Sequence, residues 1–189
     1  MDEIDKKIIA QLQADGRTSL EELAKITGFT SMGIKKRLDR LIEKGIIKIS
    51  ALINPGALGF HPAVVMLEME SAEAMQNVLD RFADCPRVIQ IFKTMGGYNL
   101  IALVIAEDSE TLKSISMEKC SLRSSPGIRR SEFYPINETL FSPFLQVRES
   151  LALREKNSPP CKVDCDPCVR FKLQKCVGCP TTSKYKGAL

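Results

Sequence analysis

Five cysteines lie close together near the end of the chain, in the segment CKVDCDPCVRFKLQKCVGCP at residues 161–180. Their spacing, C-x3-C-x2-C-x7-C-x2-C, contains two C-x2-C pairs. Each pair lets two sulfurs bind the same ion, and the seven-residue spacer can fold back to bring the pairs together. The spacing therefore predicts a metal site. Its candidate ligands are Cys161, Cys165, Cys168, Cys176 and Cys179.

Three chemistries are open for this segment. Zinc is the first expectation, because a segment with so few large apolar residues needs a staple and four thiolates form a common structural zinc site. An iron–sulfur cluster is the alternative, since Cys179-Pro180 matches the Cys-Pro ending of some cluster motifs. A metal-free thiol switch, in which Cys161 exchanges with its neighbours, is the third.

Two further cysteines and a single histidine lie outside this segment. Cys85 and Cys120 are each expected near a helix end, as small buried apolar side chains without a chemical role. His61 precedes a proline at the start of a predicted strand, and we expect its role to be structural or incidental.

Residues 1–53 are predicted to form a helix-turn-helix domain, because apolar residues recur at helical spacing in three short stretches. The third stretch, from Ser31, directs Ile34 and Leu38 inward and a basic face outward, which suits a helix in a DNA groove. The alternative is an ordinary solvated face. The candidate DNA contacts are Thr30, Ser31, Met32, Gly33, Lys35, Lys36, Arg37 and Arg40.

The rest of the chain divides into four parts. The stretch IIKISALI at 46–53 is predicted as a strand, and 54–60 as a hinge. Residues 61–147 predict the element order βαββαβ, an α+β ferredoxin-like fold whose sheet has one bare face, so we expect a dimer or higher oligomer. A helical linker at 148–160 then sets the cysteine-rich tail, 161–189, apart as an appendage.

Several short motifs follow one another over the first 60 residues: an Asp-x-x-Asp start, the turn ADGR, the pattern LA…TG, the helix RLDRL ending in GII, and INPGALGF. In that order they resemble the Lrp/AsnC family of bacterial and archaeal transcriptional regulators. The resemblance implies a winged helix-turn-helix DNA reader joined to a ferredoxin-like effector and oligomerisation domain.

The resemblance also implies that a small-molecule effector binds near the loop made of Gly96, Gly97, Tyr98 and Asn99, where subunits meet. The family usually has Asp where this chain has Asn99. Because an amide cannot neutralise an ammonium group, this difference argues against an amino acid as the effector.

Composition narrows the function further. No apolar run approaches the roughly 18 residues that span a bilayer, and the charged start MDEIDKKII is unlike a signal peptide, so we expect a cytoplasmic protein. No catalytic residues are predicted. An enzyme similar to the sirohaem decarboxylases, using His61, Arg129 and Arg130, is the alternative from another class, and a metal-binding adaptor that does not read DNA is a third.

Overall fold

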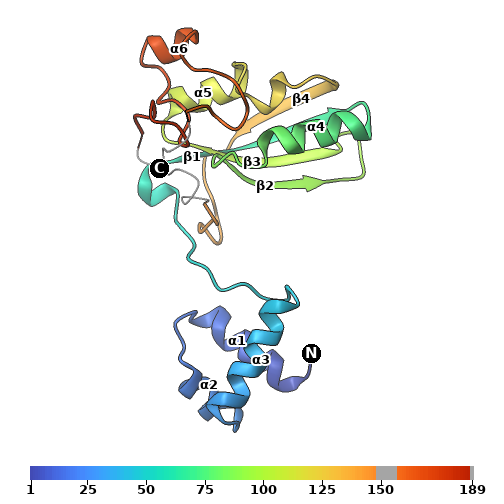
Figure 1. The fold of residues 1–189 in the computed structure, drawn as a ribbon, viewed down its shortest axis with the longest axis vertical. Helices are drawn as coiled ribbons and strands as arrows, with labels where there is room; N and C mark the ends of the chain where they lie inside the picture. The colour runs from blue at the N-terminus through green and yellow to red at the C-terminus, as the bar shows by residue number, and fades with distance from the viewer. Residues whose placement is uncertain (148–156, 188–189) are drawn as a thin grey trace. The chain divides into compact units, whose positions relative to one another are not determined.

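The computed structural model describes residues 1–147 and 157–187, which form two compact units divided after Ala51 (Figure 1). Each unit has its own apolar core. Most of the predicted helical linker, residues 148–156, lies outside the described residues. No helix in the described part of the chain is long and apolar enough to cross a membrane.

The first unit consists of three helices: α1 (Glu3–Ala14), α2 (Leu20–Thr27) and α3 (Ser31–Glu43). The three helices are capped by Asp2, Ser19 and Thr30, and each of these side chains accepts a hydrogen bond from a backbone N–H of the first helical turn. Gly28 ends α2 in the left-handed conformation, with φ of 76°, which favours glycine. The core that joins the helices contains Ile8, Leu23, Ala24 and Ile34.

The strand predicted at 46–53 is wrong for the described chain. Only Ile53 is paired, through a single antiparallel bridge to Leu145. The stretch has the apolar and β-branched composition of a strand, but a strand also needs a neighbour for its backbone hydrogen bonds. Ile46 and Ile49 are both about half exposed, 47% and 50%, and residues 46–52 pair with no strand among the described residues.

The second unit begins with a short 3-10 turn, η1 (Gly56–Leu58), and then follows the predicted order βαββαβ. Its strands form one antiparallel sheet in the order β2-β3-β1-β4, and α4 and α5 contribute to the same core (Figure 1). The α+β ferredoxin-like prediction is confirmed. The elements are β1 (His61–Met69), α4 (Ala72–Phe82), β2 (Val88–Lys93), β3 (Leu100–Ala106), α5 (Ser109–Met117), η2 (Leu122–Ser124) and β4 (Ile128–Pro135).

Along β1, one face of the sheet is buried and the other is not. Val65 and Leu67 lie in the core with the helices, whereas Val64 and Met66, which alternate with them, are half-exposed. An apolar sheet face of this kind favours a covering partner.

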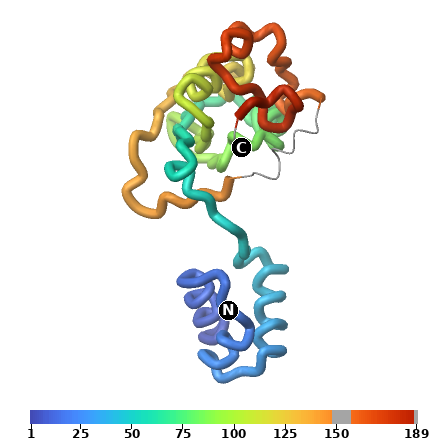
Figure 2. The backbone as a smooth tube through the Cα atoms, turned by 90° about the vertical axis from the view of Figure 1, so that its left-hand side faces the viewer, coloured from blue at the N-terminus to red at the C-terminus, as the bar shows by residue number. Residues whose placement is uncertain are grey.

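The cysteine-rich tail is docked on the second unit rather than set apart from it. The described part of the tail contains the helix α6 (Val169–Lys172), which lies near α5. Figures 1 and 2 both draw the tail, orange to red, beside the helices of this unit. Arg170 joins the two elements by donating from Nε to Ser114 Oγ (2.6 Å) and from Nη2 to the Glu110 carbonyl (2.8 Å).

The tail contacts both faces of the sheet at the end of β3. Cys161 packs against the core on the helix-covered face, to which Val104 belongs, and Tyr185 packs with Ile105 and Phe60 in a separate cluster. Because consecutive strand residues point to opposite faces, the tail holds this strand end from both sides.

Candidate functional site

The outward face of α3 has the predicted composition. Ile34 and Leu41 are buried, at 0% and 1% exposure, while Lys35, Lys36 and Met32 are exposed. Neither lysine forms an ion pair with another described residue. Two unpaired cations therefore lie on the solvent side of the helix.

Two of the predicted DNA contacts also have partners inside the unit. Arg37 Nη1 donates to Asp2 Oδ2 (2.7 Å) and to Asp5 Oδ1 (2.9 Å), and the Arg37 side chain is only 22% exposed. Arg40 Nη2 donates to Asp5 Oδ2 at 2.9 Å. These contacts tie α3 to the start of α1. Sequence reasoning missed them, although the Asp-x-x-Asp motif at the start of α1 was the signal.

The two aspartates are held in their charged forms. A hydrogen bond from the Asp5 backbone N–H, assisted by Arg37, lowers the pKa of Asp2 to about 2. Burial alone would raise the pKa of Asp5, but the hydrogen bonds from Arg37 and from the Asp2 backbone outweigh it and lower this pKa as well. The charge of each arginine is therefore partly neutralised within the unit.

The start of α3 is a capped helix end. Thr30 Oγ1 accepts from the Gly33 backbone N–H at 3.2 Å, and Ser31 is the first helical residue. A Cβ at Gly33 would lie 3.3 Å from Thr30 Oγ1, so glycine leaves room for this cap. Contacts from these residues to DNA stay a prediction.

The predicted effector loop joins β2 to β3. The Asn99 amide forms two hydrogen bonds to the end of β1. Its Oδ1 accepts from the Met69 N–H (2.8 Å), and its Nδ2 donates to the Met69 carbonyl (2.9 Å). The Tyr98 hydroxyl donates to Glu132, and Arg130 lies over the Tyr98 ring at 4.4 Å. The structure brings Gly97 close to Arg130 as well. These side chains fix the loop to β1 and β4.

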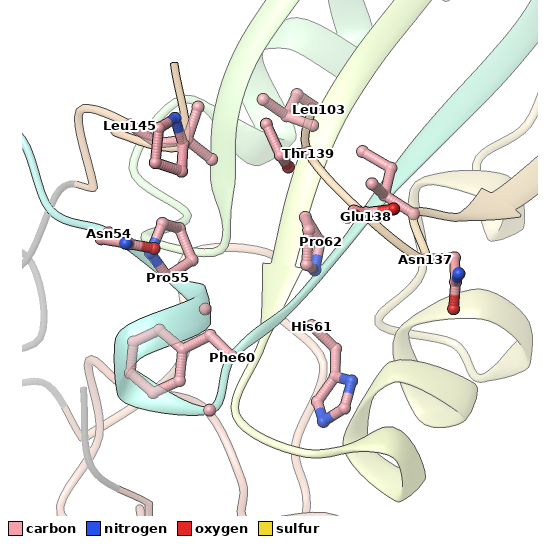
Figure 3. A pocket seen from close by; sticks show the side chains of 14 residues that line it. Asn54, Pro55, Phe60, His61, Pro62, Leu103, Asn137, Glu138, Thr139 and Leu145 are labelled. Atoms are coloured by element: carbon pink, nitrogen blue, oxygen red, sulfur yellow. The ribbon is translucent and has the colours of Figure 1, made fainter. Parts of the chain in front are cut away.

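A pocket of about 580 Å3 lies at the other ends of β1 and β4, away from the loop of residues 96–99 (Figure 3). Figure 3 shows Phe60, just before β1, His61, at the start of β1, and Asn137 and Glu138 from the segment after β4. Residues 96–99 do not line it. His61 is exposed at its margin, and we assign it no chemistry.

The tail cysteines are partly buried, and none forms a disulfide. The first C-x2-C pair closes a tight turn, in which the Cys168 N–H donates to the Cys165 carbonyl at 3.0 Å. In the second pair, Cys179 Sγ lies 3.3 Å from Thr181 Oγ1. No three side chains of His, Cys, Asp or Glu among residues 1–147 and 157–187 converge as ligands of one ion. The predicted convergence of the two pairs is therefore not preformed.

Two family models match the chain. A winged helix-turn-helix DNA-binding model covers residues 1–48, and an Lrp/AsnC ligand-binding domain model covers residues 62–143. Both end before the tail, so the tail cysteines lie outside them.

Curated relatives and solved structures agree with these models. The chain is 36% identical over 115 residues to the HTH-type transcriptional regulator FL11 of Pyrococcus furiosus, covering 60% of this chain and 76% of the relative. It is 29% identical over 120 residues to the regulator Ptr1 of Methanocaldococcus jannaschii, covering 63% of this chain and 81% of the relative. The crystal structure of the leucine response regulatory protein LrpA of Mycobacterium tuberculosis is similar with a TM-score of 0.66 at 26% identity, covering 76% of this chain and 97% of that one.

Proposed function

Because the chain belongs to the Lrp/AsnC family of DNA-binding transcriptional regulators, we propose that it binds operator DNA as a homodimer, with α3 of each subunit in a major groove. Its relatives are named as regulators, and the chain is a regulator rather than an enzyme. Since its target is DNA, we place it in the cytoplasm.

The outward face of α3 carries this proposal. Arg37 and Arg40 form ion pairs with Asp2 and Asp5. Lys35 and Lys36 are therefore the cations of this helix that are most available to phosphate. Phosphate contacts of this kind position a helix in the groove, and base contacts then specify the sequence.

Salt titration of DNA binding tests this role. Lys35→Ala and Lys36→Ala should each weaken binding to a genomic fragment selected with the wild-type protein, and each should reduce the slope of log affinity against log salt by about one. Lys119→Ala is the matched control, because it removes the same charge from an exposed position of the second unit. An equal loss in this control, or wild-type affinity that is the same at low and high salt, contradicts the proposal.

We also propose that the half-exposed face of the sheet pairs two subunits. Val64 and Met66 are the β1 side chains on that face. Sedimentation equilibrium should give a dimer or larger assembly for the wild-type chain, and Met66→Lys should shift it toward monomer while the far-UV circular dichroism stays unchanged. A monomeric wild-type chain at micromolar concentration contradicts this part.

A small-molecule effector at the loop of residues 96–99 is the third part of the proposal, supported by the match to a ligand-binding domain. Both ends of the Asn99 amide are already bonded to Met69, so we do not expect Asn99 to bind an ammonium group. Calorimetric titration with amino acids and with other small metabolites tests this. Tight binding of an amino acid that is lost in Asn99→Ala would contradict the expectation.

The last part of the proposal concerns metal binding by the cysteine-rich tail. We propose that its cysteines bind a thiophilic metal, with Cys161, Cys165, Cys168, Cys176 and Cys179 as candidate ligands, zinc as the first candidate and an iron–sulfur cluster as the alternative. Metal analysis and an absorption spectrum of anaerobically purified protein distinguish the two. Zinc without visible absorption supports the first, and iron with broad visible absorption supports the second. A chain without metal after anaerobic reconstitution contradicts both.

A further inference from the structure

Six of the seven cysteines line one cavity, of about 60 Å3, in the second unit. Two of them belong to the ferredoxin-like domain, where Cys85 follows α4 and Cys120 follows α5. The remaining four come from the tail. The complete set is Cys85, Cys120, Cys161, Cys165, Cys176 and Cys179. Cys168, although it belongs to a C-x2-C pair, does not line this cavity.

Apart from Arg87, the other residues that line the cavity are apolar or glycine. Val65, Val88 and Val104 come from the helix-covered face of the sheet, and Phe82 and Ile115 come from α4 and α5. About 10–15 Å3 of such space is enough for one water molecule, so a cavity of about 60 Å3 can hold a group larger than a single small atom. The thiols are thus gathered around a space in an apolar setting.

The domain cysteines and the tail cysteines also share one apolar core. Cys85 and Cys161 both pack against the buried cluster that contains Val65, Val88 and Val104. The domain and the tail are therefore in contact at the cavity.

The tail is held over the cavity by charged contacts. Arg87 lines the cavity, pairs with Glu107 at 2.8 Å and donates from Nη2 to the Gly178 carbonyl at 2.6 Å. Tyr185 completes the anchor by donating to Glu107 Oε1 at 2.6 Å. Gly178 lies between Cys176 and Cys179, so this anchor fixes the second C-x2-C pair against the domain. The guanidinium also places a positive charge beside sulfurs that would become negative as metal ligands.

The arrangement differs from a site for one tetrahedral ion. Such an ion needs four ligands converging at about 2.3 Å from one point. In the described ranges 1–147 and 157–187 not even three candidate ligands converge in this way. Six cysteines line one cavity instead, which suits a centre that contains several metal atoms.

We propose that this cavity binds one polynuclear, thiolate-ligated metal centre, to which Cys85 and Cys120 supply ligands from the domain and the tail cysteines supply the others. The inference rests on the proposed metal binding by the tail and changes its ligand set. Two centres share this chemistry: an iron–sulfur cluster takes four thiolates, and a dinuclear zinc centre takes six.

Cysteine variants separate a shared centre from a site confined to the tail. The full-length chain is purified anaerobically and assayed for iron, zinc and acid-labile sulfide. Cys85→Ser/Cys120→Ser should lower the metal content per chain at least about tenfold, since even partners outside the ligand set cost 10–100-fold in affinity. Cys168→Ser separates the two ligand sets, because a shared centre keeps its metal in this variant and a site confined to the tail loses it. The control is Lys119→Ala, an exposed change beside Cys120, which should retain the metal. Iron with sulfide then identifies a cluster, and two zinc ions per chain identify the dinuclear centre.

The opposite pattern overturns the inference. Metal retained by Cys85→Ser/Cys120→Ser and lost in Cys168→Ser means a site confined to the tail, which leaves the proposed function intact. One zinc ion per chain without sulfide rejects a polynuclear centre. A wild-type chain that binds no metal rejects both the inference and metal binding by the tail.

A second measurement needs no core substitution, in case the double variant unfolds. In the wild-type protein labelled with 13C at the cysteine Cβ atoms, metal loading should shift the signals of Cys85 and Cys120 and leave that of Cys168 in place. Cys85→Ala/Cys120→Ala, checked by circular dichroism, provides a second folded test. Unshifted signals of Cys85 and Cys120 in the metal-loaded protein overturn the inference.

Discussion

The two carboxylates at the start of α1 set which cations of α3 are available to phosphate. Asp5 is 1% exposed and accepts from both Arg37 and Arg40, while Asp2 accepts from Arg37 and from the Asp5 backbone N–H. A buried carboxylate needs such partners, because an unpaired charge in the interior is costly. The arginines of α3 are therefore bonded within the unit, which leaves Lys35 and Lys36 as the cations that we propose for DNA recognition.

Replacing Arg37 should move the titration of Asp2. In Arg37→Met, the pKa of Asp2 should rise from about 2 toward the ordinary value of 3.8, because one of the hydrogen bonds that stabilise the carboxylate is lost. The lowered pKa stabilises the folded unit above pH 3.8, and this contribution is lost as the pH falls through about 2. An NMR titration that follows the Asp2 carboxyl carbon measures the change.

The control for this titration is Lys7→Met, which removes an exposed cation of α1 that has no ion pair to Asp2. Its Asp2 pKa should match that of the wild type. A value near 2 in Arg37→Met would show that the Asp5 backbone hydrogen bond alone is sufficient.

Among the elements, the turn at the second C-x2-C pair depends on Gly178. Its φ of 88° lies in the left-handed region, and a Cβ there would lie 3.0 Å from the Phe171 ring and 3.3 Å from the Lys184 carbonyl. Gly178→Ala should therefore lower the free energy of unfolding of the second unit by about 1–2 kcal/mol through the left-handed backbone alone. Hydrogen exchange of peptides covering 176–187 should accelerate.

Gly96→Ala is the matched control, because a Cβ at Gly96 meets nothing within 4 Å and its φ is not in the left-handed region. This variant should leave exchange in the tail at the wild-type rate. Equal effects of the two substitutions would show that the turn does not depend on Gly178.

Local patterns in the sequence predict most of the elements. The helices of both units and the strands around residues 61–135 follow from apolar periodicity and from capping residues such as Ser19 and Ser71. The strand at 46–53 fails because periodicity does not supply a pairing partner. Strand β4 ends at Pro135, which is also the last β4 residue that pairs with β1.

The site is less predictable than the elements, because it depends on contacts between distant residues. Burial of Cys85 and Cys120 follows from their type, and the structure bears it out for both in part. Their position around the same cavity as the tail cysteines depends on Arg87 and Gly178, which are 91 residues apart. No short-range spacing contains that information.

At the scale of the whole molecule, the two units have separate cores and should respond separately to loss of the tail. Truncation after residue 147 exposes Ile105 and Phe60, now 0% and 7% exposed, and removes the Tyr185 contact to Glu107. The second unit should lose about 2–4 kcal/mol of stability, since burial of one large apolar side chain contributes about 1.5–3 kcal/mol.

Hydrogen exchange resolved by peptide measures both responses in one sample. Peptides from the second unit should exchange faster in the truncated chain, and peptides from residues 1–51 should keep their wild-type rates. Faster exchange in both units would show that their stabilities are linked.

The tail contacts the end of β3 on both faces of the sheet. Val104 lies against the thiols and Ile105 lies beneath Tyr185 on the reverse surface, yet only one stiff peptide group separates the two side chains. Any displacement of this strand end on loading with metal must tilt both residues at once. Metal bound on the helix-covered side of the sheet would then change the position of a residue on the other side directly, without intermediate residues.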